Sequence, residues 1–440
     1  MFTVVEQGGR PLSENVQSGK FVFEQGQAPP GQTVLYQEHL KLTDMSHMTV
    51  FAGYMMPLWY SSISAEHRAV RQAAGAFDCT HMGVFETAGP DAAAFLNIVT
   101  TNEINNLKAG RAQYSYILDA GGNVLDDIIV YRRSEDKFMV VVNAANEGKI
   151  KAYFQGLLND EVVIDTSRPG MKLKFRPVIR DVKEPAAGAD RRVDIAVQGP
   201  VSMEVLFAAG TDAASKKSIE QLGRFELTDA VVGGIDCIVA RTGYTGAEMG
   251  FELFVHPGKA VRLWRTILER GKPAGVLPCG LGARDSLRIE AGLPLYGHEL
   301  ASEYNISPIE AGYGWAVKLE KKFFIGKAAM IRAAESCIMK QARIEMPGAA
   351  GVRPIRQNDA VLDKKGECVG WVLSCAKADD RQMAIAYVGK DQIKVADTVG
   401  IYYLARNERQ IRQGRRKIVG RGQKLAADIT GKVLSRFERF

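Results

Sequence analysis

The chain has 440 residues and a mass of 48.2 kDa, which leaves room for two to four domains. Apolar residues make up 46% and charged residues 24% of the sequence, and this ordinary balance excludes a collagen, a long coiled coil and wholesale disorder. No apolar run approaches the roughly 18 residues of a membrane span, so we expect no membrane partner. The six cysteines form no C-x-x-C pair, which favours reduced thiols in a cytosol-like compartment.

The net charge of +7 sits in one segment near the end of the chain. Residues 406–424 hold eight lysines and arginines and a single acid, Glu408, so the rest of the chain is electrically balanced. This distribution argues against a globally basic protein, and we expect no nucleic-acid partner. Two interpretations of the segment stay open: a solvated loop, or a surface that attracts an acidic partner.

Helical and extended patterns alternate through the first half of the chain. Residues 1–35 lack periodic apolar positions and are interpreted as an N-terminal extension. The helical pattern covers residues 65–74, 90–101 and 147–158. The extended pattern covers 114–133, as a hairpin around Gly121-Gly122, and 137–145.

The second half of the chain begins with an irregular stretch. Residues 168–192 are rich in proline and charge and are interpreted as an insertion. Beyond them, helices are predicted over 201–209 and 258–271, and strands over 192–200, 230–242 and 250–256. Short strands then follow at 341–346, 360–363, 368–375, 383–389, 399–406 and 432–440. These short, turn-separated strands predict a C-terminal β-barrel or sandwich.

General catalytic motifs are missing from the sequence. It has no phosphate-binding loop, no dinucleotide-binding G-x-G-x-x-G, no H-E-x-x-H and no G-x-S-x-G. Its six histidines are scattered, and we expect no metal site. Nucleotide hydrolysis, hydride transfer and zinc chemistry are therefore disfavoured.

Two adjacent aspartates open the strand VLDDIIV. Because side chains alternate along a strand, Asp126 shares a face with Ile128 and Val130, and Asp127 points to the opposite face. An acid on an apolar face is costly unless it has partners or a function. The alternative is that both aspartates cap the preceding turn.

Two further charged constellations stand out. Glu252 lies in a predicted strand directly after the glycine-rich loop RTGYTGAEMG, where the alternative is a solvent-facing side chain on a hairpin. Arg284 and Arg288 are four residues apart on a predicted helix with Asp285 between them. The alternative for these residues is a surface ion-pair ladder, which usually contributes little stability.

Together these segments resemble the glycine cleavage T-protein family, the aminomethyltransferases. The resembling segments, in the order of that family, are LYQEHLKL, FAGYMMPLWY, SAEHRAVRQAAGAFDCTHMG, GGNVLDDIIVY, VVNAAN, AVQGP, TGYTG, GLGARDSLRIEAGLPLYG and ISPIEAGYGWAVKLEKKFFIGK. They run from about residue 35 to about residue 335.

The resemblance implies an α+β, three-domain folate-binding fold with mostly antiparallel sheets and a C-terminal β-barrel. Residues 36–165 and 193–335 would form two interleaved domains around a folate channel, and 340–440 the barrel, with 406–424 as a basic insertion. Tetrahydrofolate would be the cofactor. A lipoylated carrier, the H-protein, would deliver an aminomethyl group, and ammonia would leave. The location would be cytoplasmic, or the mitochondrial matrix in a eukaryote.

The same motifs imply roles for individual residues. Asp126, the first aspartate of L-D-D, would be the catalytic residue that orients and polarises the reacting amine, and Asp127 would be structural. The residues implied to bind folate or line its site are Met82, Tyr114, Asn143, Tyr244, Glu252, Arg284 and Trp315. A carboxylate suits the donor-rich edge of a pterin, and an arginine suits the anionic folate tail.

The sequence departs from the family pattern in its loops. The glycine loop before Glu252 is one residue longer than usual, and VLSCAKADDRQ replaces a Thr-Ser-Gly turn followed by Ser-Pro. Two other functions stay open: a tetrahydrofolate-dependent demethylase of a small methylated donor, and a non-catalytic folate-binding accessory protein. Retention of the L-D-D, GYTG and GARD motifs argues against the accessory protein.

Overall fold

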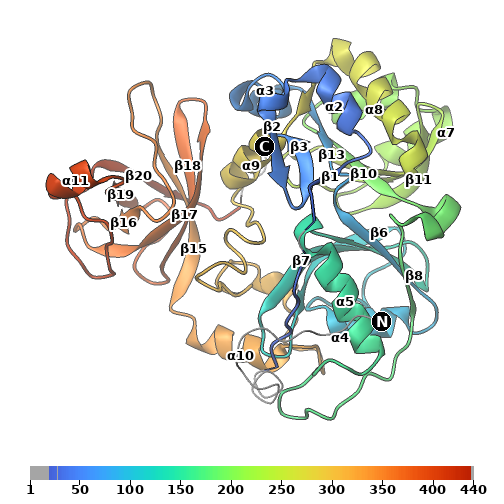
Figure 1. Ribbon diagram of the computed structural model, residues 1–440, viewed down its shortest axis with the longest axis horizontal. Helices are drawn as coiled ribbons and strands as arrows, with labels where there is room; N and C mark the ends of the chain where they lie inside the picture. The colour runs from blue at the N-terminus through green and yellow to red at the C-terminus, as the bar shows by residue number, and fades with distance from the viewer. Residues whose placement is uncertain (1–18, 27, 438–440) are drawn as a thin grey trace.

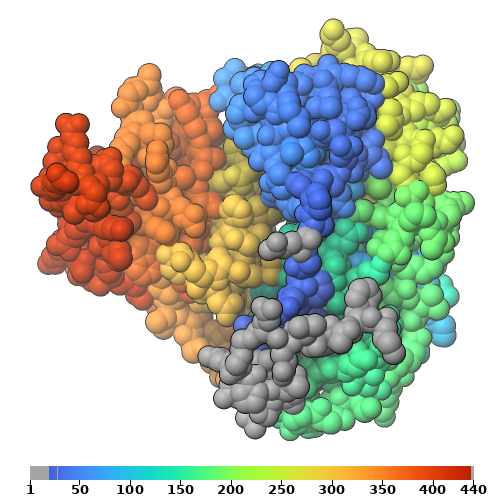
Figure 2. Space-filling model, in the orientation of Figure 1, coloured from blue at the N-terminus to red at the C-terminus, as the bar shows by residue number. Residues whose placement is uncertain are grey.

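The computed structural model describes residues 19–26 and 28–437. Two α+β layers form the body of the molecule, and a closed barrel stands beside them as a separate lobe (Figures 1 and 2). Most strand pairs are antiparallel, so the α+β fold with a C-terminal barrel that the sequence predicts is confirmed. No helix in the described ranges is long and apolar enough to cross a membrane.

A five-stranded antiparallel sheet forms the first layer. Its strands, in spatial order, are β6 (Arg111–Leu118), β7 (Val124–Arg132), β8 (Lys137–Val142), β5 (Gly83–Ala88) and β9 (Val178–Asp181). Helices α4 (Ala92–Val99) and α5 (Glu147–Leu158) cover one face. Apolar side chains of both helices, such as Phe95 and Phe154, pack there against Ile128 and Val130 of β7.

A six-stranded mixed sheet forms the second layer. Its order is β11 (Leu227–Val232), β12 (Ile235–Ala240), β13 (Gly250–Val255), β10 (Val193–Gln198), β4 (Ala74–Asp78) and β14 (Val276–Cys279), with only β4 and β14 parallel. One face carries α6 (Ser202–Ala208), α7 (Ala213–Glu220) and α8 (Pro257–Gly271). The other face carries α3 (Ile63–Gln72) and α9 (Leu281–Ala291) over β4 and β14.

A small sheet joins the start of the described chain to this body. It contains β1 (Gly31–Gln32), β3 (Tyr54–Pro57) and β2 (Met48–Phe51), and α2 (Tyr36–Leu42) lies between β1 and β2 in the chain. The part of the expected extension that the structure describes therefore includes one strand, which pairs in parallel with β3. Residues 1–18 and residue 27 of that extension lie outside the described residues.

The barrel closes from six antiparallel strands. Their order is β15 (Met339–Pro347), β18 (Arg381–Gly389), β17 (Cys368–Ala378), β16 (Ala360–Leu362), β19 (Thr398–Tyr402) and β20 (Ile429–Leu434), and α10 (Lys327–Ser336) leads into it. Apolar residues such as Ile344, Val372 and Ile401 fill its interior.

The two stretches that look inserted have different structures. Residues 168–192 contain β9, which pairs with β5 and extends the first sheet, so this stretch is more than an excursion between strands. The basic segment 406–424 contains α11 (Glu408–Arg412) and lies at the outer end of the barrel, on the side away from the two sheets (Figure 1). Arg415 pairs with Asp428 of the barrel, which fixes part of the segment in place.

Candidate functional site

A cavity of about 540 Å³ lies between the inner faces of the two sheets. Next to it the sheets touch directly, where Met139 and Val141 of β8 meet Ile238 and Phe254 of the second sheet. The cavity is lined from both sheets, from α9 and from the loops after α9. Its volume falls within the range of sites that enclose a small molecule.

The alternation of strand β7 decides which aspartate faces this cavity. Asp127, Ile129 and Tyr131 line it. Asp126 is fully buried on the opposite face, with Ile128 and Val130 under the helices. The expectation that Asp126 lies at the ligand is therefore wrong in position. The sequence separates the two faces correctly, but both faces are buried, and the cavity lies on the side of Asp127.

Asp127 is held by two neighbours. The Tyr114 hydroxyl donates to its Oδ2 at 2.8 Å, and the Asn143 side-chain amide donates to its Oδ1 at 2.9 Å. Burial raises the pKa of Asp127 above its ordinary range, and these hydrogen bonds oppose the rise. Asp127 is thus a carboxyl group with a raised pKa in the wall of the cavity.

Asp126 has the environment of a structural residue. Its carboxylate accepts from the backbone N–H of Asn143 at 2.9 Å, from the Asn143 side chain at 2.8 Å and from the Asn146 side chain at 2.5 Å. Burial and the neighbouring Asp127 raise its pKa. Asn143 donates to both aspartates, so Asp126 fixes the amide that in turn orients Asp127.

Glu252 faces the cavity from the second sheet. The Tyr131 hydroxyl donates to its Oε2 at 2.8 Å, and the Thr242 hydroxyl donates to the same oxygen. Two glycines of the preceding loop, Gly243 and Gly250, are required because the side chain of Gln198 leaves no room for a Cβ atom. A Cβ at Gly243 would lie 1.9 Å from the side-chain oxygen of Gln198, and one at Gly250 would lie 2.6 Å from it. Gln198 fills that space and lines the cavity.

Arg284 enters the cavity from α9. Its guanidinium donates to the Cys79 sulfur at 3.4 Å and lies 5.3 Å from the centre of the Tyr244 ring. Burial opposes the charge of Arg284, but its electrostatic interactions with the surrounding groups, Cys79 and Glu252 first among them, outweigh burial and raise its pKa. Burial and Glu252 also raise the pKa of Asp194, which lies beneath this group on β10.

Aromatic rings form one wall of the cavity. Tyr313 lies 5.0 Å from Tyr114 and 5.7 Å from Trp315, measured between ring centres, and Trp315 is 51% exposed. The wall is completed by Phe437, which follows the last barrel strand and packs edge-on against Tyr313 at 5.1 Å. Arg436 anchors this tail by donating to Ala311 O at 3.0 Å and to the Gln341 side chain at 2.6 Å.

The structure brings together all but one of the residues that the motifs single out. Those that line the cavity are Met82, Tyr114, Asn143, Tyr244, Glu252, Arg284 and Trp315. Asp127 and His81, which the sequence reasoning interprets as structural, also line it, as do Tyr131, Tyr296 and Phe437, which that reasoning does not single out. The alternation of β7 could have found Tyr131 once Asp127 was chosen. Tyr296 lies at the end of the resembling segment GLGARDSLRIEAGLPLYG, which could have marked it, whereas Phe437 comes from a distant irregular segment that no local pattern marks.

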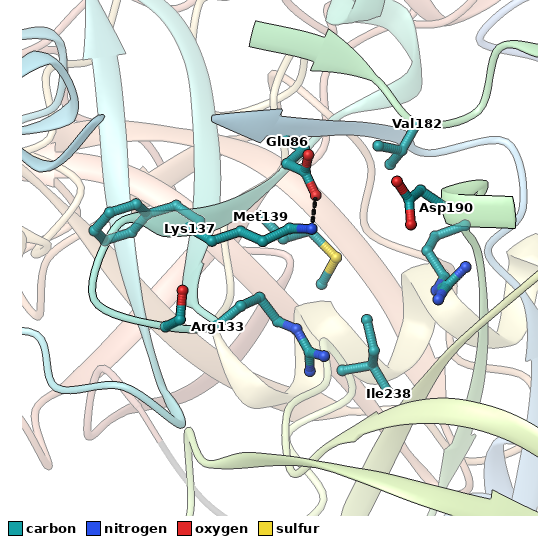
Figure 3. Close-up of a pocket in the computed structure, with 10 residues that line it drawn as sticks. Glu86, Arg133, Lys137, Met139, Val182, Asp190 and Ile238 are labelled. Carbon is teal, nitrogen blue, oxygen red and sulfur yellow. Dashed lines mark ion pairs between the residues drawn. The ribbon is translucent and has the colours of Figure 1, made fainter. Parts of the chain in front are cut away.

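A second, smaller hollow of about 250 Å³ lies at the outer edge where the two sheets meet (Figure 3). Lys137 and Glu86 face each other across it at 2.7 Å, above the side chain of Met139. Arg133 pairs with Asp229 at 2.7 Å. These pairs satisfy one another, which leaves the larger cavity as the candidate site. Within residues 19–26 and 28–437, no group of three or more His, Cys, Asp or Glu side chains is placed to hold a metal ion.

The fold and the cavity define a three-part enzyme with a buried site for a small molecule. Residues 35–321 match the GCVT N-terminal domain. The chain is 41% identical to an aminomethyltransferase of Streptomyces avermitilis over 364 residues, which is 82% of this chain and 89% of that protein. It is 40% identical to an aminomethyltransferase of Thermus thermophilus, over 81% of this chain and 91% of that protein.

A solved structure agrees with these sequences. The glycine cleavage system aminomethyltransferase T from Bartonella henselae superimposes with a TM-score of 0.70 and 28% identity, over 93% of this chain and 99% of that chain. The chain belongs to the GCVT family, the aminomethyltransferases of the T-protein type.

Proposed function

We propose that this enzyme transfers a one-carbon unit from an aminomethylated lipoyl carrier to tetrahydrofolate, with release of ammonia. The observation that carries the proposal is the position of Asp127, a buried carboxyl group with a raised pKa in the wall of the cavity. The names of the relatives support the aminomethyl donor.

The cavity fits a folate by its chemistry. Glu252 offers acceptor oxygens to the donor-rich edge of a pterin, and the ring of Tyr244 offers it a flat surface. Arg284 supplies a buried positive charge, and the cluster around Tyr313 suits the aromatic middle of the molecule. Bound tetrahydrofolate would supply the amine that accepts the one-carbon unit.

In this proposal Asp127 is the catalytic residue. Tyr114 and Asn143 fix its two oxygens, so the carboxylate is oriented before any ligand arrives. A fixed negative charge in a partly enclosed cavity would stabilise the positive charge that develops during the transfer more strongly than water does. The same carboxylate is able to take a proton from the reacting amine, because its raised pKa brings it closer to the working pH.

The test is a coupled assay of the purified chain with tetrahydrofolate and an aminomethylated lipoyl carrier, reading ammonia and methylene-tetrahydrofolate. We expect both products in equal amounts, and tetrahydrofolate alone should raise the melting temperature and saturate one site per chain. The same assay with small N-methylated amines in place of the carrier tests the demethylase alternative. Product from those amines and none from the carrier would replace the proposal, and failure to bind tetrahydrofolate at millimolar concentration would remove it.

A further inference from the structure

Lys149 and Tyr296 form a close pair at one end of the cavity. Lys149 lies in the first turn of α5, and Tyr296 lies in the loop after α9. The lysine Nζ is 2.6 Å from the tyrosine hydroxyl and 4.3 Å from the centre of its ring. Tyr296 lines the cavity, whereas Lys149 stands behind it and is half-buried, so part of its surface reaches solvent.

The chemistry of the pair fixes the direction of its hydrogen bonds. An ammonium group has three donors and no acceptor, so the Tyr296 oxygen must accept from Lys149. The phenolic proton is then left for another acceptor, and the side chain of Tyr296 lines the cavity. Tyr296 is thereby able to donate its hydroxyl proton to an acceptor in the cavity.

Burial and nearby charges shift the pKa values of both members of the pair. Burial lowers the pKa of Lys149 to about 8, and Asp126 opposes that fall. Burial, Asp126 and Asp127 together raise the pKa of Tyr296 to about 12, so the phenol keeps its proton until another base takes it. His298 also lines this cavity, and Glu147 on the same turn of α5 is paired with Lys183 at 2.9 Å.

We propose that Lys149 and Tyr296 form a proton relay that carries a proton from solvent to the amine leaving the donor in the cavity. This inference rests on the proposed function, because the leaving amine is the ammonia of that reaction. The phenolic O–H bond breaks as an N–H bond forms on the departing nitrogen. An N–H bond of Lys149 breaks to restore the phenolic O–H bond, and the neutral lysine then takes a proton from a solvent water molecule, which leaves hydroxide in solution.

The relay predicts a large loss of rate without a loss of folate binding. Tyr296→Phe and Lys149→Met should each lower kcat by about 10²-fold or more, the usual contribution of general acid catalysis. Their melting temperatures and tetrahydrofolate affinities should stay near those of the unchanged protein. Lys151→Met is the matched control, because Lys151 lies on the same helix but pairs with Glu184 at the surface, and its kcat should not change.

Lys149→Arg separates a relay from a purely positioning role. Arginine keeps a donor to the Tyr296 oxygen but does not release its proton in this pH range. The relay predicts that Lys149→Arg lowers kcat as much as Lys149→Met does. In the unchanged enzyme, kcat should fall above about pH 8 as Lys149 loses its proton. That fall, the basic limb of the pH profile, should be absent from Lys149→Arg. A Lys149→Arg enzyme with the unchanged rate and basic limb overturns the relay, as does a Tyr296→Phe enzyme that keeps more than a tenth of the rate. If the unchanged protein releases no ammonia from the aminomethylated carrier, both the proposed function and the relay fail together.

Discussion

The hydroxyl of Tyr131 on β7 donates a 2.8 Å hydrogen bond to Glu252 on β13 and so joins the two sheets across the cavity. The Thr242 hydroxyl donates to the same carboxylate oxygen. Glu252 is only partly buried, and hydrogen bonds to a carboxylate are stronger than those between neutral groups. The contact between the sheets is therefore partly polar, and it keeps the second oxygen of Glu252 available to a ligand.

The two neighbouring aspartates should separate catalysis from folding. We expect Asp127→Asn to lower kcat about 10²-fold or more while the protein stays folded, because it removes a charge that acts in the transition state. Asp126→Asn should instead lower the free energy of unfolding by roughly 1–3 kcal/mol. The carboxylate of Asp126 accepts three hydrogen bonds in the core, and an asparagine side chain replaces one acceptor oxygen with an NH2 donor. Steady-state kinetics and urea unfolding of both variants measure the two effects. An Asp126→Asn enzyme that is stable but inactive would restore the original assignment of the catalytic role to Asp126.

The sequence predicts helices and hairpins better than it predicts this site. The prediction of a helix over 147–158 matches α5 to the residue, because its apolar positions and ends are local signals. To choose between Asp126 and Asp127, one must know what covers each face of β7. The helices and the second sheet that cover these faces come from distant parts of the chain, so the local sequence does not reveal them. Strand β9 was missed for a similar reason, since its four residues, Val178–Asp181, are stabilised by pairing with β5 and not by their own pattern.

The buried pair of Arg288 and Glu299 offers a test of how the body and barrel are held together. The two side chains are 1% and 0% exposed and lie 2.8 Å apart, and Arg288 also reaches Ser374 of the barrel strand β17. Arg288→Met should cost about 3–5 kcal/mol of unfolding free energy, because it leaves Glu299 buried and unpaired. Adding Glu299→Gln should recover part of that loss in guanidinium unfolding. Additive losses in the double variant would show that the two side chains do not interact.

Glu290 should make the stability of the protein depend on acid pH. It lies on α9 and accepts from Arg71 at 2.8 Å, from His67 at 3.1 Å and from Arg381 of the barrel at 2.9 Å. Burial raises its pKa, but these partners outweigh burial and lower it from 4.5 to about 2. A lowered pKa stabilises the folded state above pH 4.5, and this contribution is lost as pH falls from 4.5 toward 2.

The corresponding variant is Glu290→Gln. It should be less stable than the unchanged protein at pH 7 by roughly 1–3 kcal/mol, the scale of hydrogen bonds to a charged group, and the difference should shrink toward pH 3. Thermal unfolding across this pH range measures both quantities. A difference that stays constant with pH would mean that the carboxylate is not charged in the fold.

The basic segment 406–424 should have little influence on the carrier. Its α11 lies at the outer end of the barrel, away from the sheets that enclose the cavity (Figure 1), and Arg415 is already paired with Asp428. We expect Arg412→Gln with Lys417→Gln to leave KM for the carrier and its salt dependence unchanged, since both residues lie in this segment. A raised KM at low salt and a flatter salt series would instead support the docking surface.

The tail that follows β20 brings a residue from the end of the barrel into the cavity wall. Arg436 is hydrogen-bonded between the body and the barrel, and Phe437 stands in the cavity wall against Tyr313. Any excursion that lifts the barrel from the body withdraws that ring and opens the cavity to water. A ligand that packs on the ring must therefore favour the docked barrel, and the docked barrel must favour the ligand by the same free energy. Sequence changes deep in the barrel, far from any bound atom, are then able to weaken binding through the docking equilibrium alone.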